Sequence, residues 1–200
     1  MFTQEDGEFA VKTARKAIES SVKGGKIDMG KIPEKFERKM GVFVTINRYP
    51  SEELRGCIGY PEPVYPLKEA IIKGADNATR DPRFSPLSED ELDSIVVEVS
   101  LLTPPEKVDY DDPSELPKKV ICGKHGLIAS KGSRRGLLLP QVSVDQNWDE
   151  QQFLTHTCRK AGLHPDEWRN GDCEIEVFEG VIFKEKEPYG EIVRRDIDDN

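Results

Sequence analysis

One apolar run, SIVVEVSLL at residues 94–102, limits the architecture of this chain more than any other segment. Its β-branched residues favour a strand, and apolar side chains fall on both faces of that strand. Such a strand must be covered on both sides, so we place it at the centre of a sheet. Hydrophobic residues make up 36% of the chain and charged residues 34%. That composition is polar for a globular protein, and the apolar run is the reason that we expect a packed core rather than disorder.

The remaining segments predict an α+β fold with a mostly antiparallel sheet flanked by helices. Helices and strands do not alternate strictly along the chain and hairpins are frequent, which disfavours a doubly wound parallel sheet. The length of 200 residues fits one domain, or one domain with a small subdomain. The expected helices are 5–23, 66–80, a short one after the capping box SEDE at 88–91, and one from an Asn147 cap to Gly162; the expected strands are 41–46, 54–60, 94–102, two within 125–140, and 173–183.

Charge and composition exclude several classes of partner. The net charge of −9 argues against nucleic acid, because phosphate contacts require an excess of basic residues. No apolar run approaches the roughly 20 residues of a membrane span, and the start MFTQEDGEFAVK lacks the apolar region of a secretory signal. The four cysteines form no C-x-x-C pair, and no zinc, Walker or dinucleotide spacing occurs. We therefore expect a cytoplasmic protein with reduced thiols, no nucleic-acid or membrane partner, and no metal or other cofactor.

The hexapeptide LRGCIG at 54–59 is the segment most suggestive of chemistry. Alternate residues of a strand share a face, so Arg55, Cys57 and Gly59 are expected on one side, with Gly59 leaving space beside the sulfur. A nearby cation lowers a thiol pKa, which makes an Arg–Cys pair a candidate nucleophile or anion site. The alternative is that Cys57 is a small buried hydrophobe and that the glycines only let backbone pack closely.

The motif DPRF at 81–84 follows the expected helix 66–80. In one interpretation it is a helix stop, in which Asp81 pairs with Arg83 and Phe84 joins the core. In the other, Arg83 offers a second guanidinium fork to a carboxylate or phosphate ligand.

Two more residues stand out by their surroundings. Glu98 is a carboxylate within the apolar run, so it either faces solvent on an edge or meets an arginine, for which Arg55 and Arg83 are candidates. His125, between glycines in GKHGL, is either an exposed turn residue or a general base for Cys57.

Several blocks in a fixed order resemble the family of the AMME chromosomal region gene 1 protein. They cover about residues 8–185, and LRGCIG is the hallmark of that family; the others are GVFVTI, DPRFSPLSEDEL, EVSLLTPP, HGL, GLLLPQV, NWDEQQFL and CRKAGL. The resemblance implies an α+β domain with a smaller subdomain, placed within about 104–145, and a cleft between the two that contains the hallmark. It also implies a pathway link to Memo-type and radical-enzyme partners, but it brings no settled activity.

Two functions follow as alternatives. The first is an enzyme or ligand-processing protein whose cleft binds a small anionic molecule. The second is a non-catalytic adaptor or regulatory module that binds a protein partner. Under the first hypothesis Cys57 is the nucleophile and His125 the base, and the ligand-binding residues are Arg55, Gly56, Gly59, Asp81, Arg83 and Gln141.

Overall fold

The computed structural model describes residues 2–195, which form two compact units. Unit 1 comprises residues 2–102 and 181–195, and unit 2 comprises residues 103–180. The subdomain expected within about 104–145 falls inside unit 2. Each unit has its own hydrophobic core, so each is described separately.

The sheet of unit 1 is centred on the apolar run identified in the sequence. Its order is β2 (Leu54–Tyr60), β1 (Val42–Arg48), β3 (Ile95–Leu102) and the C-terminal part of β7 (Glu174–Glu185), with β8 (Ile192–Arg195) paired to β7. The pairs β1–β2, β1–β3 and β7–β8 are antiparallel. All of β3 is buried, which confirms the prediction of a central strand covered on both faces.

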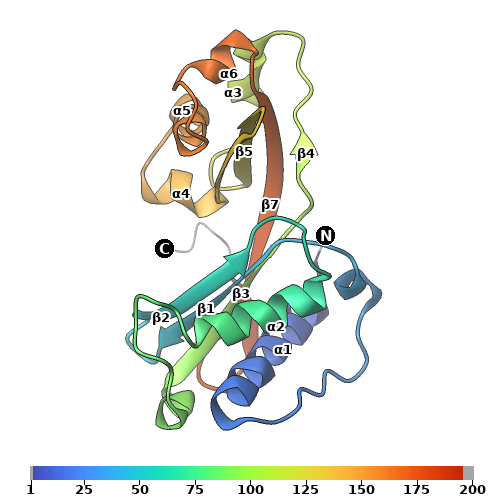
Figure 1. Cartoon of the computed structure of the whole chain (residues 1–200), viewed down its shortest axis with the longest axis vertical. Helices are drawn as coiled ribbons and strands as arrows, with labels where there is room; N and C mark the ends of the chain where they lie inside the picture. The colour runs from blue at the N-terminus through green and yellow to red at the C-terminus, as the bar shows by residue number, and fades with distance from the viewer. Residues whose placement is uncertain (1, 196–200) are drawn as a thin grey trace. The chain divides into compact units, whose positions relative to one another are not determined.

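Two amphipathic helices, α1 (Gln4–Lys23) and α2 (Leu67–Ala78), lie side by side on one face of this sheet (Figure 1). Thr3 and Asp6 form a capping box that begins α1, and Gly24 with a φ of 80° ends it. The 3₁₀ helices of the unit are η1 (Glu34–Glu37) and η2 (Glu89–Ser94). The predicted helices 5–23 and 66–80 and the SEDE capping box are therefore confirmed.

Unit 2 contains the second predicted hairpin. Strands β5 (His125–Lys131) and β6 (Arg134–Leu138) pair in antiparallel register, and β5 also pairs with the N-terminal part of β7, to which β4 (Glu106–Lys107) is added. The helical elements are η3 (Pro113–Glu115), α3 (Leu116–Lys119), α4 (Pro140–Asp145), α5 (Glu150–Lys160) and α6 (Glu167–Asn170). Strands and helices together confirm the α+β class.

The predicted cap at Asn147 is wrong. Asp149 is the N-cap of α5: its side chain accepts from the amide of Gln152, and the Gln152 side chain accepts from the amide of Asp149. Asn147 instead adopts a left-handed conformation with a φ of 51°, just after α4. Among the described residues, no helix is both long enough and apolar enough to span a membrane.

Candidate functional site

The hallmark LRGCIG is strand β2, at the edge of the unit 1 sheet, and a neighbouring segment holds its backbone. The amide of Cys57 donates to Asp81 Oδ2 at 2.9 Å, and Arg83 Nη2 donates to the carbonyl of Cys57 at 3.3 Å. An unpaired strand edge invites pairing with another chain. Here the two side chains occupy the free backbone groups of Cys57 and prevent such pairing at that residue.

Asp81 and Arg83 are also bound to each other. Asp81 is 1% exposed, and its carboxylate accepts from Arg83 Nε at 3.0 Å and from Arg83 Nη2 at 2.6 Å. The Arg83 hydrogen bonds hold the pKa of the Asp81 carboxyl well below its usual range. The Arg83 fork is therefore occupied by Asp81, as the helix-stop interpretation predicts. Phe84 is half-buried, and its ring centre lies 5.6 Å from the Arg83 guanidinium.

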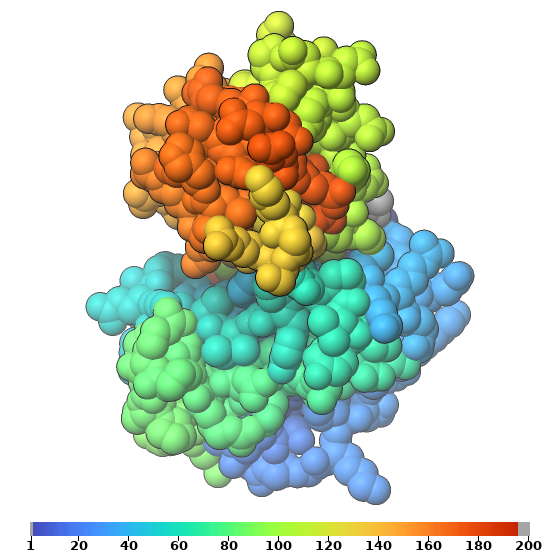
Figure 2. Space-filling view, turned by 45° about the horizontal axis from the view of Figure 1, so that its top comes forward, coloured from blue at the N-terminus to red at the C-terminus, as the bar shows by residue number. Residues whose placement is uncertain are grey.

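Arg55 is directed into the segment 86–91, which lies on the surface of unit 1 (light green in Figure 2). It is 2% exposed, and Nε and Nη2 donate to the two oxygens of Glu91 at 2.7 and 2.9 Å. Arg55 and the hydrogen bonds from Ser88 lower the pKa of Glu91 to about 2. Within the part of the chain that the structure describes, Arg55 Nη1 is buried and has no hydrogen-bond partner.

The expectation that Arg55 and Cys57 emerge side by side is wrong, because the strand is irregular there. Ile46 pairs with Gly56 and Asn47 with Leu54, so Arg55 is the extra residue of a β-bulge. A bulge interrupts the alternation of side chains and redirects the residue within it. The charged groups that act on the Cys57 thiol are Arg83, Glu98 and Asp81, and Arg55 is not among them.

The environment of Cys57 does not activate its sulfur. Sγ accepts a hydrogen bond from Thr45 Oγ1 at 3.3 Å. Burial raises the pKa of the thiol more than Thr45 and Arg83 lower it, so the predicted lowering of the pKa is also wrong. A thiol is nucleophilic as thiolate, and this one is held as the neutral form near neutral pH.

The two glycines of the hallmark are sites of close packing. A Cβ on Gly56 would lie 2.3 Å from the carbonyl oxygen of Ala78, at the end of α2. A Cβ on Gly59 would lie 2.3 Å from the ring of Phe43. The space above Gly59 is therefore filled by that ring, and both contacts agree with the backbone-packing alternative.

Glu98 lies in a row with Thr45 and Cys57 across β3, β1 and β2. Burial raises the pKa of its carboxyl, and its partner is Arg195, whose Nη1 lies at 3.4 Å. The alternative in which Glu98 meets an arginine is confirmed, but neither candidate, Arg55 or Arg83, is that arginine. Strand β8 brings Arg195 into unit 1 instead.

The other two candidate residues belong to unit 2. His125 begins β5, and its Nδ1 accepts from the amide of Ile121 at 3.2 Å. Burial and the neighbouring Lys124 lower the pKa of His125, so the ring is neutral near neutral pH. Gln141 is half-buried in the first turn of α4.

Sequence reasoning missed Thr45 and Glu91 as partners of the hallmark. The S-x-x-E pattern of the capping box did mark Glu91, but for helix capping alone. No local pattern joins Arg55 to Glu91, because the two residues are 36 positions apart.

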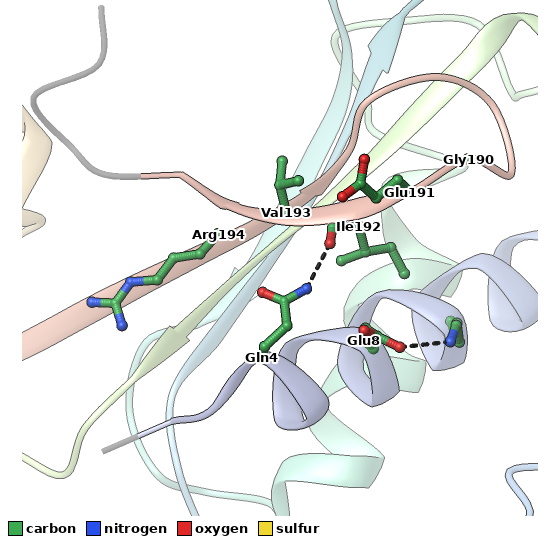
Figure 3. A pocket seen from close by; sticks show the side chains of 8 residues that line it. Gln4, Glu8, Gly190, Glu191, Ile192, Val193 and Arg194 are labelled. Atoms are coloured by element: carbon green, nitrogen blue, oxygen red, sulfur yellow. Dashed lines mark hydrogen bonds and ion pairs between the residues drawn. The ribbon is translucent and has the colours of Figure 1, made fainter.

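A separate pocket of about 400 Å³ lies beside the start of α1 and β8 (Figure 3). Gln4 Nε2 donates to the carbonyl of Ile192 at 2.6 Å across it, and Glu8 is paired with Lys12. No hallmark residue lines this pocket. In the described part of the chain, no group of three or more His, Cys, Asp or Glu side chains is arranged to hold a metal ion.

Comparison with known proteins finds relatives that match nearly the whole length of this chain. Protein MK0488 of Methanopyrus kandleri is 51% identical over 98% of this chain and 96% of its own length, and protein MJ0810 of Methanocaldococcus jannaschii is 50% identical over 98% of both. The crystal structure of the uncharacterized protein PH0010 from Pyrococcus horikoshii matches with a TM-score of 0.81 and 50% identity, over 98% of each chain. The AMMECR1 family model matches residues 11–183. The match covers most of the chain, including the hallmark strand and its partner segment, and the chain belongs to the AMMECR1 family.

Proposed function

We propose that this protein is a non-catalytic adaptor or regulatory module that binds a protein partner, with LRGCIG as a structural element of its fold. One observation carries the non-catalytic part of the proposal: the amide, the carbonyl and the sulfur of Cys57 each have a hydrogen-bond partner. Asp81 holds its amide, Arg83 its carbonyl and Thr45 its sulfur. A catalytic cysteine needs a free, ionised sulfur, and burial here raises the thiol pKa.

The test is the alkylation rate of Cys57 as a function of pH. Full-length protein is treated with iodoacetamide, and peptide mass spectrometry measures each adduct separately. Because only thiolate reacts, the rate at Cys57 should rise about tenfold per pH unit and still be rising at the ordinary pKa of 9.0. Cys122 is a matched internal control, since it is also half-buried and its pKa is also raised by burial.

A plateau in the Cys57 rate near neutral pH would show an activated thiol and overturn the proposal. Cys57→Ser should keep the unfolding midpoint and partner binding. A Memo-type protein is the first partner to test, by co-elution of the two full chains in size-exclusion chromatography. Loss of binding in a folded Cys57→Ser protein would count against a purely structural role of the sulfur.

A second candidate is binding of a small anion at Arg83 without thiol chemistry. It is favoured by the Arg83 side chain, which is 54% exposed although its Nε and Nη2 already donate to Asp81. Inorganic phosphate and citrate should then raise the unfolding midpoint of the wild type, and Arg83→Gln should abolish the rise. Arg80→Gln is the control, because Arg80 is similarly exposed and also pairs with an aspartate. No rise with the wild type would refute this candidate.

A further inference from the structure

One segment of unit 1 has a charge opposite in sign to that of the whole chain. Residues 12–39 contain nine lysines and arginines and four acidic residues, whereas the complete chain has 29 basic and 38 acidic residues. The segment comprises most of α1, the loop after it and η1 (blue in Figure 1). A protein with a net charge of −9 repels acidic molecules at long range, so any attraction of such molecules has to come from a local basic surface.

Three lysines of this segment line one pocket at the end of α1. The pocket has a volume of about 350 Å³, and the three residues, which we call the lysine cluster, are Lys16, Lys23 and Lys26. All three side chains are exposed. The cluster therefore presents three ammonium groups to one small region of the surface of unit 1.

Two hydrogen bonds hold the loop after α1 against the helix. Ser20 Oγ donates to the carbonyl of Gly25 at 2.9 Å, and Lys16 Nζ donates to the carbonyl of Asp28 at 2.8 Å. Gly24 and Gly25 have φ angles of 80° and 127°, which other residues rarely adopt, so the chain can turn back directly after the helix. This turn brings Lys26 to the same pocket as the two lysines of α1.

The charges of the lysine cluster are largely unused by the fold. Among the residues that the structure describes, neither Lys23 nor Lys26 has an ion-pair or hydrogen-bond partner. An ammonium group has three donors, so Lys16 retains two others after its bond to the loop carbonyl. Glu19 and Asp28 line the same pocket. Three lysines against two carboxylates leave the pocket with a net positive charge.

Stabilisation of the helix explains only one of the three lysines. A cation in the last turn interacts favourably with the carbonyl ends of a helix, and Lys23 lies in the last turn of α1. Lys26 lies beyond the helix, and Lys16 lies about two turns before its end. The carbonyl ends also repel anions, so an acidic group is expected to contact the lysine side chains rather than the end of the helix.

We propose that the lysine cluster binds an acidic segment of the partner protein, one that carries several Asp or Glu residues. This inference rests on the proposed function, because it names the chemistry of the protein that the adaptor binds. Positive and negative surfaces that match in this way steer association and select the partner. The described residues that line the pocket include neither an arginine nor an aromatic side chain. Arginine forks bind phosphates and aromatic rings stack on bases, so a protein segment is favoured over a nucleic acid.

The test is the binding of a fluorescent decaglutamate peptide to the full-length protein, measured by anisotropy. We expect saturable binding at about 25 mM salt, and about tenfold weaker binding at about 250 mM salt because added ions screen the charges. The triple variant Lys16→Gln, Lys23→Gln, Lys26→Gln should weaken binding at low salt by about tenfold or more. The double variant Lys23→Gln, Lys26→Gln keeps the loop bond of Lys16 and should weaken binding by about threefold or more.

The matched control is the triple variant Lys118→Gln, Arg159→Gln, Lys160→Gln, which removes three exposed positive charges from unit 2. Both triple variants have the same net charge, so a difference between them isolates the position of the charges. The control should change binding by less than about twofold.

Three results would overturn the proposal. They are no peptide binding by the wild type at low salt, equal losses in the two triple variants, and tighter binding of oligo-dT than of the peptide by the same lysines. The last result would assign the surface to nucleic acid. A plateau in the alkylation rate of Cys57 near neutral pH would refute the proposed function and leave these binding results unchanged, so the two failures are distinguishable.

Discussion

Glu91→Gln should destabilise unit 1 strongly, because Glu91 neutralises a guanidinium that is almost fully buried. Arg55 is 2% exposed and donates two hydrogen bonds to the Glu91 carboxylate. The Glu91 side chain is itself 19% exposed, so solvent screens this pair little. The amide of glutamine offers one acceptor oxygen and no charge, and Arg55 would be left as an uncompensated buried cation.

The magnitude follows from the pKa of Glu91. The pKa falls from an ordinary value of 4.5 to about 2 in the folded protein. At about 1.36 kcal/mol per pKa unit, the ionised form contributes about 3 kcal/mol to folding. Removing one partner of a buried ion pair typically costs about 3–5 kcal/mol, which agrees with this figure.

The sign of the pH dependence is fixed by the same pKa. A carboxyl whose pKa is lower in the folded state stabilises the protein above its unfolded pKa and loses that contribution as the pH falls towards the folded value. The wild-type advantage should therefore be complete at about pH 7 and fall to about 2 kcal/mol at about pH 3.5. It should vanish below about pH 2.

Urea denaturation of the wild type and of Glu91→Gln at several pH values measures this difference. Glu89→Gln is the matched control, since Glu89 is exposed on the same 3₁₀ helix. The control should differ from the wild type by less than about 0.5 kcal/mol at every pH. A difference below about 1 kcal/mol for Glu91→Gln at neutral pH, or one that does not shrink with acid, would refute the reasoning.

Three further substitutions test other parts of the fold by urea denaturation. Gly56→Ala should cost about 2–3 kcal/mol, because its Cβ would lie 2.3 Å from the backbone oxygen of Ala78, which cannot move aside easily. Asp81→Asn should cost about 3 kcal/mol at neutral pH and less in acid, because the folded pKa of Asp81 is below its ordinary value and the carboxylate holds the Cys57 amide. Asp149→Ala should cost about 1 kcal/mol through loss of the α5 cap.

Each of these substitutions has a control. For Gly56→Ala the control is Leu54→Ala, which changes an exposed side chain of the same strand. For Asp81→Asn the control is Asp76→Asn, which removes an exposed carboxylate that also pairs with an arginine. Asn147→Gly places glycine at the left-handed position and should be neutral or mildly stabilising. If a control costs as much as its partner substitution, the corresponding contact is not the cause of the loss.

The elements were predictable because their signals are local. Apolar runs, alternation and capping boxes depend on residues a few positions apart, and they gave the strand 54–60 and the η2 cap correctly. The α5 cap shows where such local patterns are not sufficient to choose between two positions. Asn147 and Asp149 each precede a Glu or Gln by three positions, so the same pattern fits both. The choice depends on α4, which ends just before Asn147 and draws that residue into a left-handed conformation.

The contacts of the site were less predictable because they depend on register and on one irregularity. Alternation along 54–59 placed Arg55 beside Cys57, but alternation fails at a bulge. A glycine inside a strand can mark a bulge, and Gly56 was interpreted as a packing residue alone. Thr45 meets Cys57 only through the register of β1 against β2. Glu98 and Arg195 are separated by 97 positions, so their pairing requires the complete sheet.

The hallmark strand and the segment 78–91 are joined by hydrogen bonds that start from each side. The Arg55 side chain of the strand donates to the carboxylate of Glu91 in the segment. The carboxylate of Asp81 in the segment accepts from the backbone amide of Cys57 in the strand. Gly56 provides the close approach that both connections need.

Under the proposed structural role, the motif needs a long guanidinium, a glycine and a small side chain in order to hold an edge strand in place. This structural role predicts which substitutions lower stability most, and a catalytic role of Cys57 predicts a different result. Substitution of Glu91, Asp81 or Gly56 should lower stability by several kcal/mol, while Cys57→Ser should lower it little and leave binding intact. A catalytic cysteine would instead lose function in a protein that is as stable as the wild type.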